Sequence, residues 1–245
     1  MLAELPLRSD REPVVGSGKG GDETTAIDAA AERAILAHFE GLDGLTIVSE
    51  EAGVIGDGET FVVIDPIDGS LNAKRGIGFF ALSIAVASGP TMGDVDFGFV
   101  HDFGTGEEWT ATRGGGATLA GTPLDGDLPK EQIEILAFEA TLTSSVAEKA
   151  AAVVDVAYRL RIMGSLALSL CHLAAGRIDA VCSLKPARAV DIAAAQLLVL
   201  ERGLAIELPE APPFATAPLD LEGRSRVVAA GTPEVCRRLA HALSA

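Results

Sequence analysis

Two aspartates that follow an apolar run are the residues best suited to chemistry. Phe61–Ile64 is typical of a buried strand, Asp65 follows it directly, and Asp68 lies three residues further on. Pro66 fixes its own φ angle and lacks an N–H donor, which favours a sharp turn after Asp65. Such a turn would aim both carboxylates at one point, where their oxygens could bind Mg²⁺. The alternative is an ordinary strand-to-loop turn with two solvated aspartates.

The residues directly after these acids suit a phosphate group. Gly69 leaves room for the backbone to approach a ligand closely. If a helix begins near Ser70, its free amides face the same point as the carboxylates and can bind a phosphate. A metal ion and a phosphate could therefore meet beside Asp68.

Further acids lie where strands end or helices begin. Glu50 and Glu51 follow the apolar run Leu45–Ser49, at the strand end where open α/β sheets bind ligands, although an exposed acidic turn would look the same. Asp191 precedes the apolar run Ile192–Leu200 and could equally be an ordinary N-cap. Neither observation by itself distinguishes a site from its structural alternative.

Asp28 lies on the semi-apolar side of a predicted helix, where an unpaired carboxylate is costly. Thr24 and Thr25 lie one turn earlier and are its candidate partners. The alternative is a solvated aspartate near the helix start.

The elements that must position these residues follow from the spacing of apolar residues. Helical spacing predicts a first long helix over Asp22–Glu40, after an irregular lead-in over residues 1–18. Short apolar runs in the first half predict strands at Leu45–Ser49, Phe61–Ile64, Phe79–Ser88, Val95–His101 and Glu108–Arg113. The second half alternates between predicted strands (Ile133–Phe138, Val153–Arg161, Ala180–Ser183, Leu204–Glu207, Arg226–Ala230) and predicted helices (Thr143–Ala152, Ser165–Ala175, Asp191–Arg202, Pro233–Leu243). This order predicts layered sheets and helices.

Composition excludes several classes of protein. The chain has 245 residues, 48% of them hydrophobic, with three cysteines and a formal net charge of −16. So large an apolar share excludes disorder, and so few cysteines exclude a disulfide scaffold. Because no signal peptide or membrane span is visible, we expect reduced thiols in a cytoplasmic protein. Its acidic surface should repel nucleic acid and anionic membranes, so an anionic substrate would require local positive charge, most simply a metal ion.

Four segments together resemble the inositol monophosphatase family, in the family's order and at about its spacing. They are Glu50-Glu51, the run from Asp65 to Asn72, the run from Arg161 to Ala167, and the run from Asp191 to Ala194. Gly18-Lys19, the run from Asn72 to Ile77 and the run from Thr105 to Trp109 resemble the archaeal-type branch, which combines inositol-phosphate and fructose-1,6-bisphosphate phosphatase activity. The resemblance extends from about Lys19 to the C-terminus.

The resemblance implies an α/β fold, a layered α-β-α-β-α five-layer sandwich in a single domain over residues 1–245. Its lobes would be 19–122, with the metal loop, and 123–245, with the substrate site, separated near the glycine-rich loops at 114–116 and 121–126. Only eighteen residues precede Lys19, so the long first helix of the family is expected to be shortened. A homodimer acting in carbohydrate metabolism is also implied.

The resemblance further implies hydrolysis of a small phosphorylated substrate by water that Mg²⁺ activates, with two or three ions for which Mn²⁺ can substitute. The expected metal ligands are Glu50, Asp65, Asp68, Asp191 and the Ile67 carbonyl. The expected catalytic residues are Asp28, Ser70 and Glu50; Ser70 stands where the family usually has Thr and would act with Asp28 on the attacking water. The expected substrate-binding residues are Asp68, Gly69, Ser70, Gly164, Ser165, Arg188 and Asp191.

Arg188 belongs to a connection, residues 184–190, that is shorter than in the archaeal branch. It could contact a second phosphate or a hydroxyl, and a solvated loop cation is the alternative. Three functions stay open: a sugar or polyol phosphatase, a nucleotide phosphatase acting on NADP or 3′-phosphoadenosine phosphate, and a metal-binding family member with weak turnover. A nucleotide phosphatase would need an aromatic side chain near Gly164–Leu184 on which the base could stack. The sequence offers only Tyr158, before that stretch, so the nucleotide function is less favoured.

Overall fold

Two β-sheets and the helices on their faces form five layers in the computed structural model, which describes residues 4–21, 23–126, 128–130, 132–139 and 142–244. Met1 and Ala245, the predicted domain ends, and Asp22, the predicted start of the first helix, lie outside the described residues. None of the helices in the described ranges has the length and apolar character needed to cross a membrane.

The first sheet has eight strands. They are β3 (Leu45–Ser49), β4 (Gly53–Ile55), β5 (Thr60–Asp68), β6 (Ala81–Ala87), β7 (Val95–Asp102), β8 (Glu108–Thr112), β9 (Gly116–Leu119) and β10 (Thr122–Pro123). Their order across the sheet is β10-β9-β8-β7-β6-β5-β3-β4, and β3 runs parallel to β5 while the other neighbours are antiparallel. Strand β5 is central and mostly buried, as its apolar run predicted.

The second sheet has five strands. They are β11 (Ile133–Glu139), β12 (Ala157–Arg161), β13 (Ala180–Ser183), β14 (Ala205–Glu207) and β15 (Val228–Ala230), in the order β12-β11-β13-β15-β14. Strand β11 is parallel to both of its neighbours, and β15 is antiparallel to both of its own.

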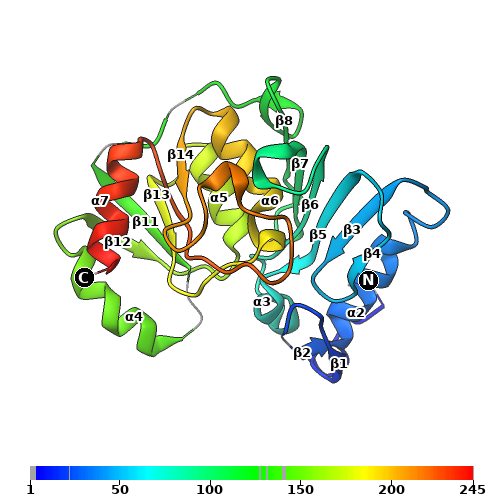
Figure 1. The fold of residues 1–245 in the computed structure, drawn as a ribbon. Coiled ribbons are helices and arrows are strands. Elements are labelled where there is room, and N and C mark those ends of the chain that lie inside the picture. Colours follow the sequence, from blue (N-terminus) through cyan, green and yellow to red (C-terminus); the bar gives the residue numbers. More distant parts are fainter. Residues whose placement is uncertain (1–3, 22, 127, 131, 140–141, 245) are drawn as a thin grey trace.

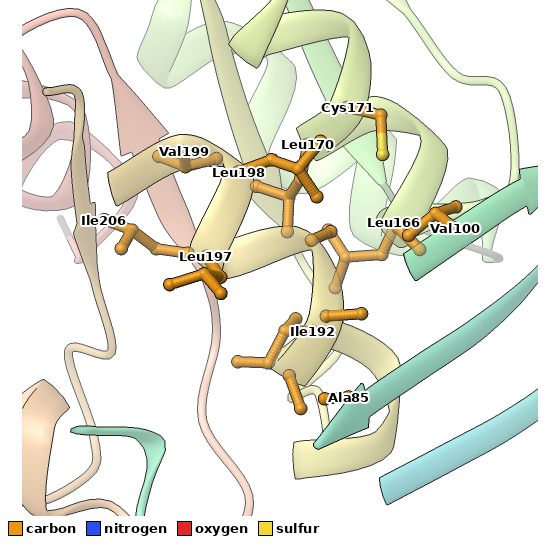
Figure 2. Close-up of a cluster of buried hydrophobic side chains, with 14 of the residues drawn as sticks. Ala85, Val100, Leu166, Leu170, Cys171, Ile192, Leu197, Leu198, Val199 and Ile206 are labelled. Carbon is orange, nitrogen blue, oxygen red and sulfur yellow. The ribbon is translucent and has the colours of Figure 1, made fainter. Parts of the chain in front are cut away.

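Helices α5 (Leu166–Ala174) and α6 (Ala189–Glu201) lie between the two sheets (Figure 1). Helix α6 is buried almost all round because both sheets cover it, and its side chains interlock with those of α5, as Figure 2 shows for Leu198 and Leu170. Cys171 belongs to this core, and like the other two cysteines it is buried and not in a disulfide. This central layer fixes the position of one sheet relative to the other.

The outer helices complete the sandwich. Helix α2 (Ala26–Leu36) packs on the first sheet, α7 (Pro233–Ser244) and the neighbouring α4 (Thr143–Ala150) lie beyond the second, and the short α3 (Ser70–Arg75) follows β5. Turns of 3₁₀ helix span Met92–Asp94, Ala151–Val153 and Phe214–Thr216. The predicted α-β-α-β-α sandwich is thus confirmed.

The predicted irregular lead-in is wrong. Helix α1 (Arg8–Arg11) is followed by strand β1 (Val14–Ser17), which pairs with β2 (Glu23–Thr25). Residues 23–25 are therefore a strand, and α2 begins at Ala26, four residues after the predicted helix start at Asp22. All of β1 is exposed, so it carries no apolar alternation by which a sequence pattern could reveal it. Helix α1 is a single turn, so residues 4–18, the described part of this segment, contain no long helix.

Candidate active site

A cavity of about 520 Å³ lies where the two sheets and the central helices meet. Its lining comes from positions as distant in the chain as Gly20 and Arg224. The predicted site residues among them are Glu50, Asp65, Ile67, Asp68, Gly69, Ser70, Gly164, Arg188 and Asp191. The fold therefore gathers most of the predicted site around one cavity.

A β-bulge, rather than the predicted sharp turn, places Asp65 and Asp68 on the same wall of the cavity. Asp65 pairs with Ser83 and Asp68 with Ala81, so three steps along β5 match two steps along β6. In a regular strand, residues three apart point to opposite faces, and one extra residue restores a common direction. The Asp65 carboxylate stabilises the bulge, since its Oδ1 accepts the Ile67 N–H at 3.0 Å.

Gly69 allows the chain to change direction between the bulge and α3. Its φ is +95°, and a Cβ there would lie 2.9 Å from the Gly164 carbonyl oxygen. Both the left-handed conformation and the close backbone contact require glycine. Ser70 is the first residue of α3, so the start of that helix lines the cavity beside the two aspartates.

Asp68 joins the first sheet to the central helices. Its Oδ2 accepts hydrogen bonds from Ser165 Oγ at 2.6 Å and from the Ala167 N–H at 2.7 Å. Ser165 is also the N-cap of α5, where its Oγ accepts the Leu168 N–H. Ser165 therefore acts here through Asp68 and the helix start, and it is not among the described residues that line the cavity.

Glu139, at the end of β11, holds the same helix start from the other side. Its Oε2 accepts the Gly164 N–H at 2.9 Å, and its Oε1 accepts Ser169 Oγ at 2.6 Å. The side chain is buried yet lines the cavity. Glu139 and Asp68 thus fix the α5 start between the two sheets.

Arg188 lies between two of the predicted metal ligands. Its Nη2 is 2.5 Å from Glu50 Oε1 and 3.0 Å from Asp191 Oδ1, and its backbone N–H donates to Asp191 Oδ2 at 2.7 Å. Asp191 is the third residue of α6 and not its N-cap, which is Arg188; its side chain supports the helix start by accepting the N–H of Arg188. This role leaves Asp191 on the cavity wall beside Arg188.

Lys185 and Arg224 join Arg188 on the cavity wall. Arg224 Nη2 donates to the Gly20 carbonyl at 3.0 Å, which fixes part of the N-terminal segment over the cavity. The lining therefore includes the acids Glu50, Asp65, Asp68 and Asp191, here called the acidic wall, and the cations Lys185 and Arg224, here called the cationic wall. Together with Arg188, these cations supply the local positive charge that an acidic protein needs for an anionic ligand.

Burial and crowding raise the pKa of the acids on the acidic wall. Burial, together with the nearby charge of Asp191, raises the pKa of Asp68 to about 8, although the hydrogen bond from Ser165 acts to lower it. Burial also raises the pKa of Glu50 to about 7, although Arg188 partly offsets this, and the pKa of Asp65 is well above its usual value through burial and the neighbouring Glu50. Clustered buried carboxylates disfavour one another's charge unless a cation joins them.

The predicted pair of Ser70 and Asp28 is not hydrogen-bonded in the described contacts. Ser70 Oγ donates to the Ile67 carbonyl at 3.1 Å. Asp28 Oδ2 accepts from the Thr25 N–H at 3.0 Å and from Thr25 Oγ1 at 2.5 Å, whereas Thr24 donates to Glu51 instead. Asp28 lies outside the cavity lining, and its shared catalytic role with Ser70 stays a prediction.

The donors of the acidic wall suit a hard divalent cation, although their spacing is not that of a bound ion. Among the described side chains, no three acids, histidines or cysteines converge as metal ligands, because Arg188 separates Glu50 from Asp191 and Asp68 is directed at Ser165. All the predicted ligands are oxygens, which Mg²⁺ prefers. The residues present therefore fit Mg²⁺.

Three charged residues of the cavity lining were missing from the sequence prediction. Glu139 follows the apolar run Ile135–Phe138 as Asp65 follows Phe61–Ile64, so the rule that found Asp65 could have found it too. Lys185 lies in the connection that contains Arg188. Arg224 comes from an irregular loop, and nothing in its sequence neighbourhood indicates that it reaches Gly20.

Comparison with known proteins adds independent evidence. A family profile described as "Inositol monophosphatase family" matches residues 6–244. A protein of Archaeoglobus fulgidus named fructose-1,6-bisphosphatase/inositol-1-monophosphatase is 33% identical over 94% of this chain and 87% of its own. One of the same name from Methanocaldococcus jannaschii is 37% identical over 81% of this chain and 77% of its own. A solved structure described as inositol monophosphatase-fructose 1,6 bisphosphatase has a TM-score of 0.86 at 30% identity, covering 99% of this chain and 93% of that one.

Proposed function

This chain belongs to the inositol monophosphatase family, and we propose that it is a Mg²⁺-dependent phosphoric monoester hydrolase acting on a sugar or polyol phosphate. Inositol-1-phosphate and fructose-1,6-bisphosphate are the proposed substrates. The names of its relatives support this substrate class, and the cavity supports the chemistry.

The observation that carries the proposal is that the acidic wall and the cationic wall line the same cavity. Asp65 and Asp68 lie on the first, and Lys185 and Arg224 lie on the second. A phosphate ester could place its scissile phosphate against the acids, once a cation neutralises them, and its second anionic or hydroxyl groups against the cations. A cavity of about 520 Å³ is of the size that small ligands occupy.

In this proposal Glu50, Asp65, Asp68, Asp191 and the Ile67 carbonyl hold the Mg²⁺ ions. Bound Mg²⁺ supplies positive charge that polarises the phosphoryl oxygens and activates water for attack. The number of ions, two or three, and the ability of Mn²⁺ to substitute are part of the proposal.

The chain's own groups then bind and orient the reactants. The backbone amides of Gly69 and Ser70 hold the phosphate, and Gly164 lies where the rest of the substrate enters. The Ser70 hydroxyl turns from the Ile67 carbonyl to the attacking water and passes a proton toward Asp28, whose unpartnered Oδ1 can accept it. No covalent nucleophile is required.

The nucleotide alternative is less well supported by the cavity. The aromatic side chain proposed for base stacking, Tyr158, is 74% exposed and lines a different cavity with Gln132 and Arg238. Among the described residues of the active-site cavity, none is aromatic. Base recognition would therefore lack the stacking surface that it commonly uses.

A substrate panel tests the proposal. Phosphate release is measured from inositol-1-phosphate, fructose-1,6-bisphosphate, NADP⁺ and 3′-phosphoadenosine phosphate, each with Mg²⁺, with Mn²⁺ and with EDTA. We expect release from the first two, supported by either metal and abolished by EDTA. Preference for the nucleotides would establish the alternative function, and binding of Mg²⁺ with no release from any substrate would establish a weakly active family member.

We also propose a homodimer, as the family resemblance implies. Light scattering coupled to size-exclusion chromatography measures its mass directly. A mass of one chain, 25.2 kDa, at micromolar concentration would contradict it.

A further inference from the structure

One guanidinium nitrogen bridges two carboxylates from distant parts of the chain. Arg188 Nη2 contacts Glu50 Oε1 and Asp191 Oδ1 at 2.5 and 3.0 Å, and Glu50 is 138 residues away in sequence. The three side chains are only 10%, 12% and 16% exposed. Such a largely buried, charge-assisted contact is protected from the solvent screening that weakens surface ion pairs.

The surrounding backbone is built around this guanidinium. A Cβ on Gly20 would lie 2.5 Å from Arg188 Nη1 and 3.2 Å from the Glu50 carbonyl oxygen, so a larger residue there would displace the guanidinium. The Gly20 N–H donates to the Glu50 carbonyl at 2.8 Å, and Arg224 holds the Gly20 carbonyl. Arg188 is therefore packed against Gly20 and hydrogen-bonded to Glu50 and Asp191.

The two bonded carboxylates are also ligands in the proposed metal site. A Mg²⁺ ion that bound Glu50 Oε1 and Asp191 Oδ1 at its usual distance of about 2.0–2.1 Å would lie in the space that Arg188 Nη2 fills. Either cation neutralises the acids, but both cannot occupy the space between them.

We propose that the Arg188 guanidinium is an internal counter-ion that takes the place of Mg²⁺ between Glu50 and Asp191 and must leave when the metal binds. This inference rests on the proposed function, because it assumes that these acids bind Mg²⁺. In the metal-free protein Arg188 holds the acids together. When Mg²⁺ enters, the side chain turns toward the cationic wall, so the measured Mg²⁺ affinity is lowered by the lost ion pairs.

Metal binding and unfolding are measured on the EDTA-treated and dialysed protein, by titration calorimetry and by melting temperature. Arg188→Gln removes the competitor, and we expect its Kd for Mg²⁺ to fall by a factor of about 3–30, while its melting temperature without metal falls as well. Saturating Mg²⁺ should raise the melting temperature of this variant more than that of the wild type. Arg188→Lys keeps the charge but lacks the planar fork, and we expect an intermediate Kd.

Arg224→Gln is the matched control, because it removes one positive charge from the same cavity without a contact to Glu50 or Asp191. It measures how much a change in cavity charge alone tightens Mg²⁺ binding. A Kd for Arg188→Gln that equals that of Arg224→Gln, or exceeds that of the wild type, overturns the inference while leaving the metal site intact. Absence of saturable Mg²⁺ binding in the wild type and in every variant overturns the metal site of the proposed function, and the inference with it. If Arg188→Gln does not fold, the Arg188→Lys measurement decides in the same way.

Discussion

At the scale of single residues, carboxylates with several partners define the cavity. Asp68 accepts hydrogen bonds from Ser165 and Ala167 through one oxygen, and Asp65 supports the bulge through one of its own. Each has oxygen lone pairs left for a ligand. Structural support and ligand binding therefore coexist in the same side chains.

Replacing Asp68 should separate these two roles. Asp68→Asn keeps an oxygen that can accept from Ser165 and removes a charge from a crowded, buried group. We expect the folded circular-dichroism spectrum to persist, while phosphate release at saturating Mg²⁺ drops to the level seen with EDTA. Asp96→Asn is the control, because Asp96 lies on the first sheet outside the cavity lining and is about half exposed, so its replacement should leave activity unchanged. Near-normal activity of Asp68→Asn would remove Asp68 from the proposed site.

Ser70 and Asp28 should act as a unit if the hydroxyl passes a proton to the carboxylate. Ser70→Ala should lower kcat by about 10²–10⁴-fold, the usual scale of a lost acid–base function. Asp28→Asn should cost a similar factor, and the double variant little more than either single one. Ser70→Thr keeps the hydroxyl and should retain activity. Losses that add fully in free energy would show that the two residues act independently.

At the scale of elements, the Glu139 carboxylate joins strand β11 to helix α5 and its start. Glu139→Ala leaves the Gly164 N–H and the Ser169 hydroxyl without their partner in a buried place. We expect a loss of about 1–3 kcal/mol in the free energy of unfolding, the usual cost of unsatisfied buried groups. Glu134→Ala, on the same strand but half exposed and paired with Lys130, should change it by less than about 0.5 kcal/mol. If urea unfolding gives the same change in the free energy of unfolding for both variants, Glu139 does not position the start of α5.

Sequence patterns predicted the elements that have an apolar face and missed those without one. Most strands of both sheets were predicted because they alternate or are fully apolar, whereas the exposed β1 and the two-residue β10 carry no such signal. The same limit applies to the site. Asp65 could be predicted from the apolar run that it follows. The bulge that aligns it with Asp68 depends on pairing with β6. The approach of Arg188 to Glu50 depends on how α6 packs.

At the scale of the whole molecule, the crowded acids couple stability to pH. The pKa of Glu50 is raised to about 7 and that of Asp68 to about 8, from ordinary values of 4.5 and 3.8. At pH values between the ordinary and the raised pKa of each acid, the folded protein binds more protons than the unfolded chain. Its free energy of unfolding therefore falls as pH rises. The favourable contribution is complete below about pH 4 and is lost as pH rises through about 7–8.

Without metal, the melting temperature should therefore be lower at pH 8 than at pH 6. Saturating Mg²⁺ should reduce this difference, because it stabilises the ionised carboxylates. Asp68→Asn removes one of the responsible groups and should show a weaker pH dependence in EDTA. Identical melting of the EDTA-treated wild type across pH 5 to 8 would show that these acids do not share one buried site.

The spread of the cavity lining along the chain, from Gly20 to Arg224, also determines when the site can form during synthesis. A nascent chain that has emerged only as far as β10 contains Asp65 and Asp68 but has neither α5, which supplies the Ser165 hydroxyl, nor α6, which carries Asp191 and follows Arg188. Because these long-range contacts form only when both sheets are available, the ribosome must release nearly the whole chain before the acids are assembled. Stabilisation by Mg²⁺ would thus distinguish a completed chain from a truncated one.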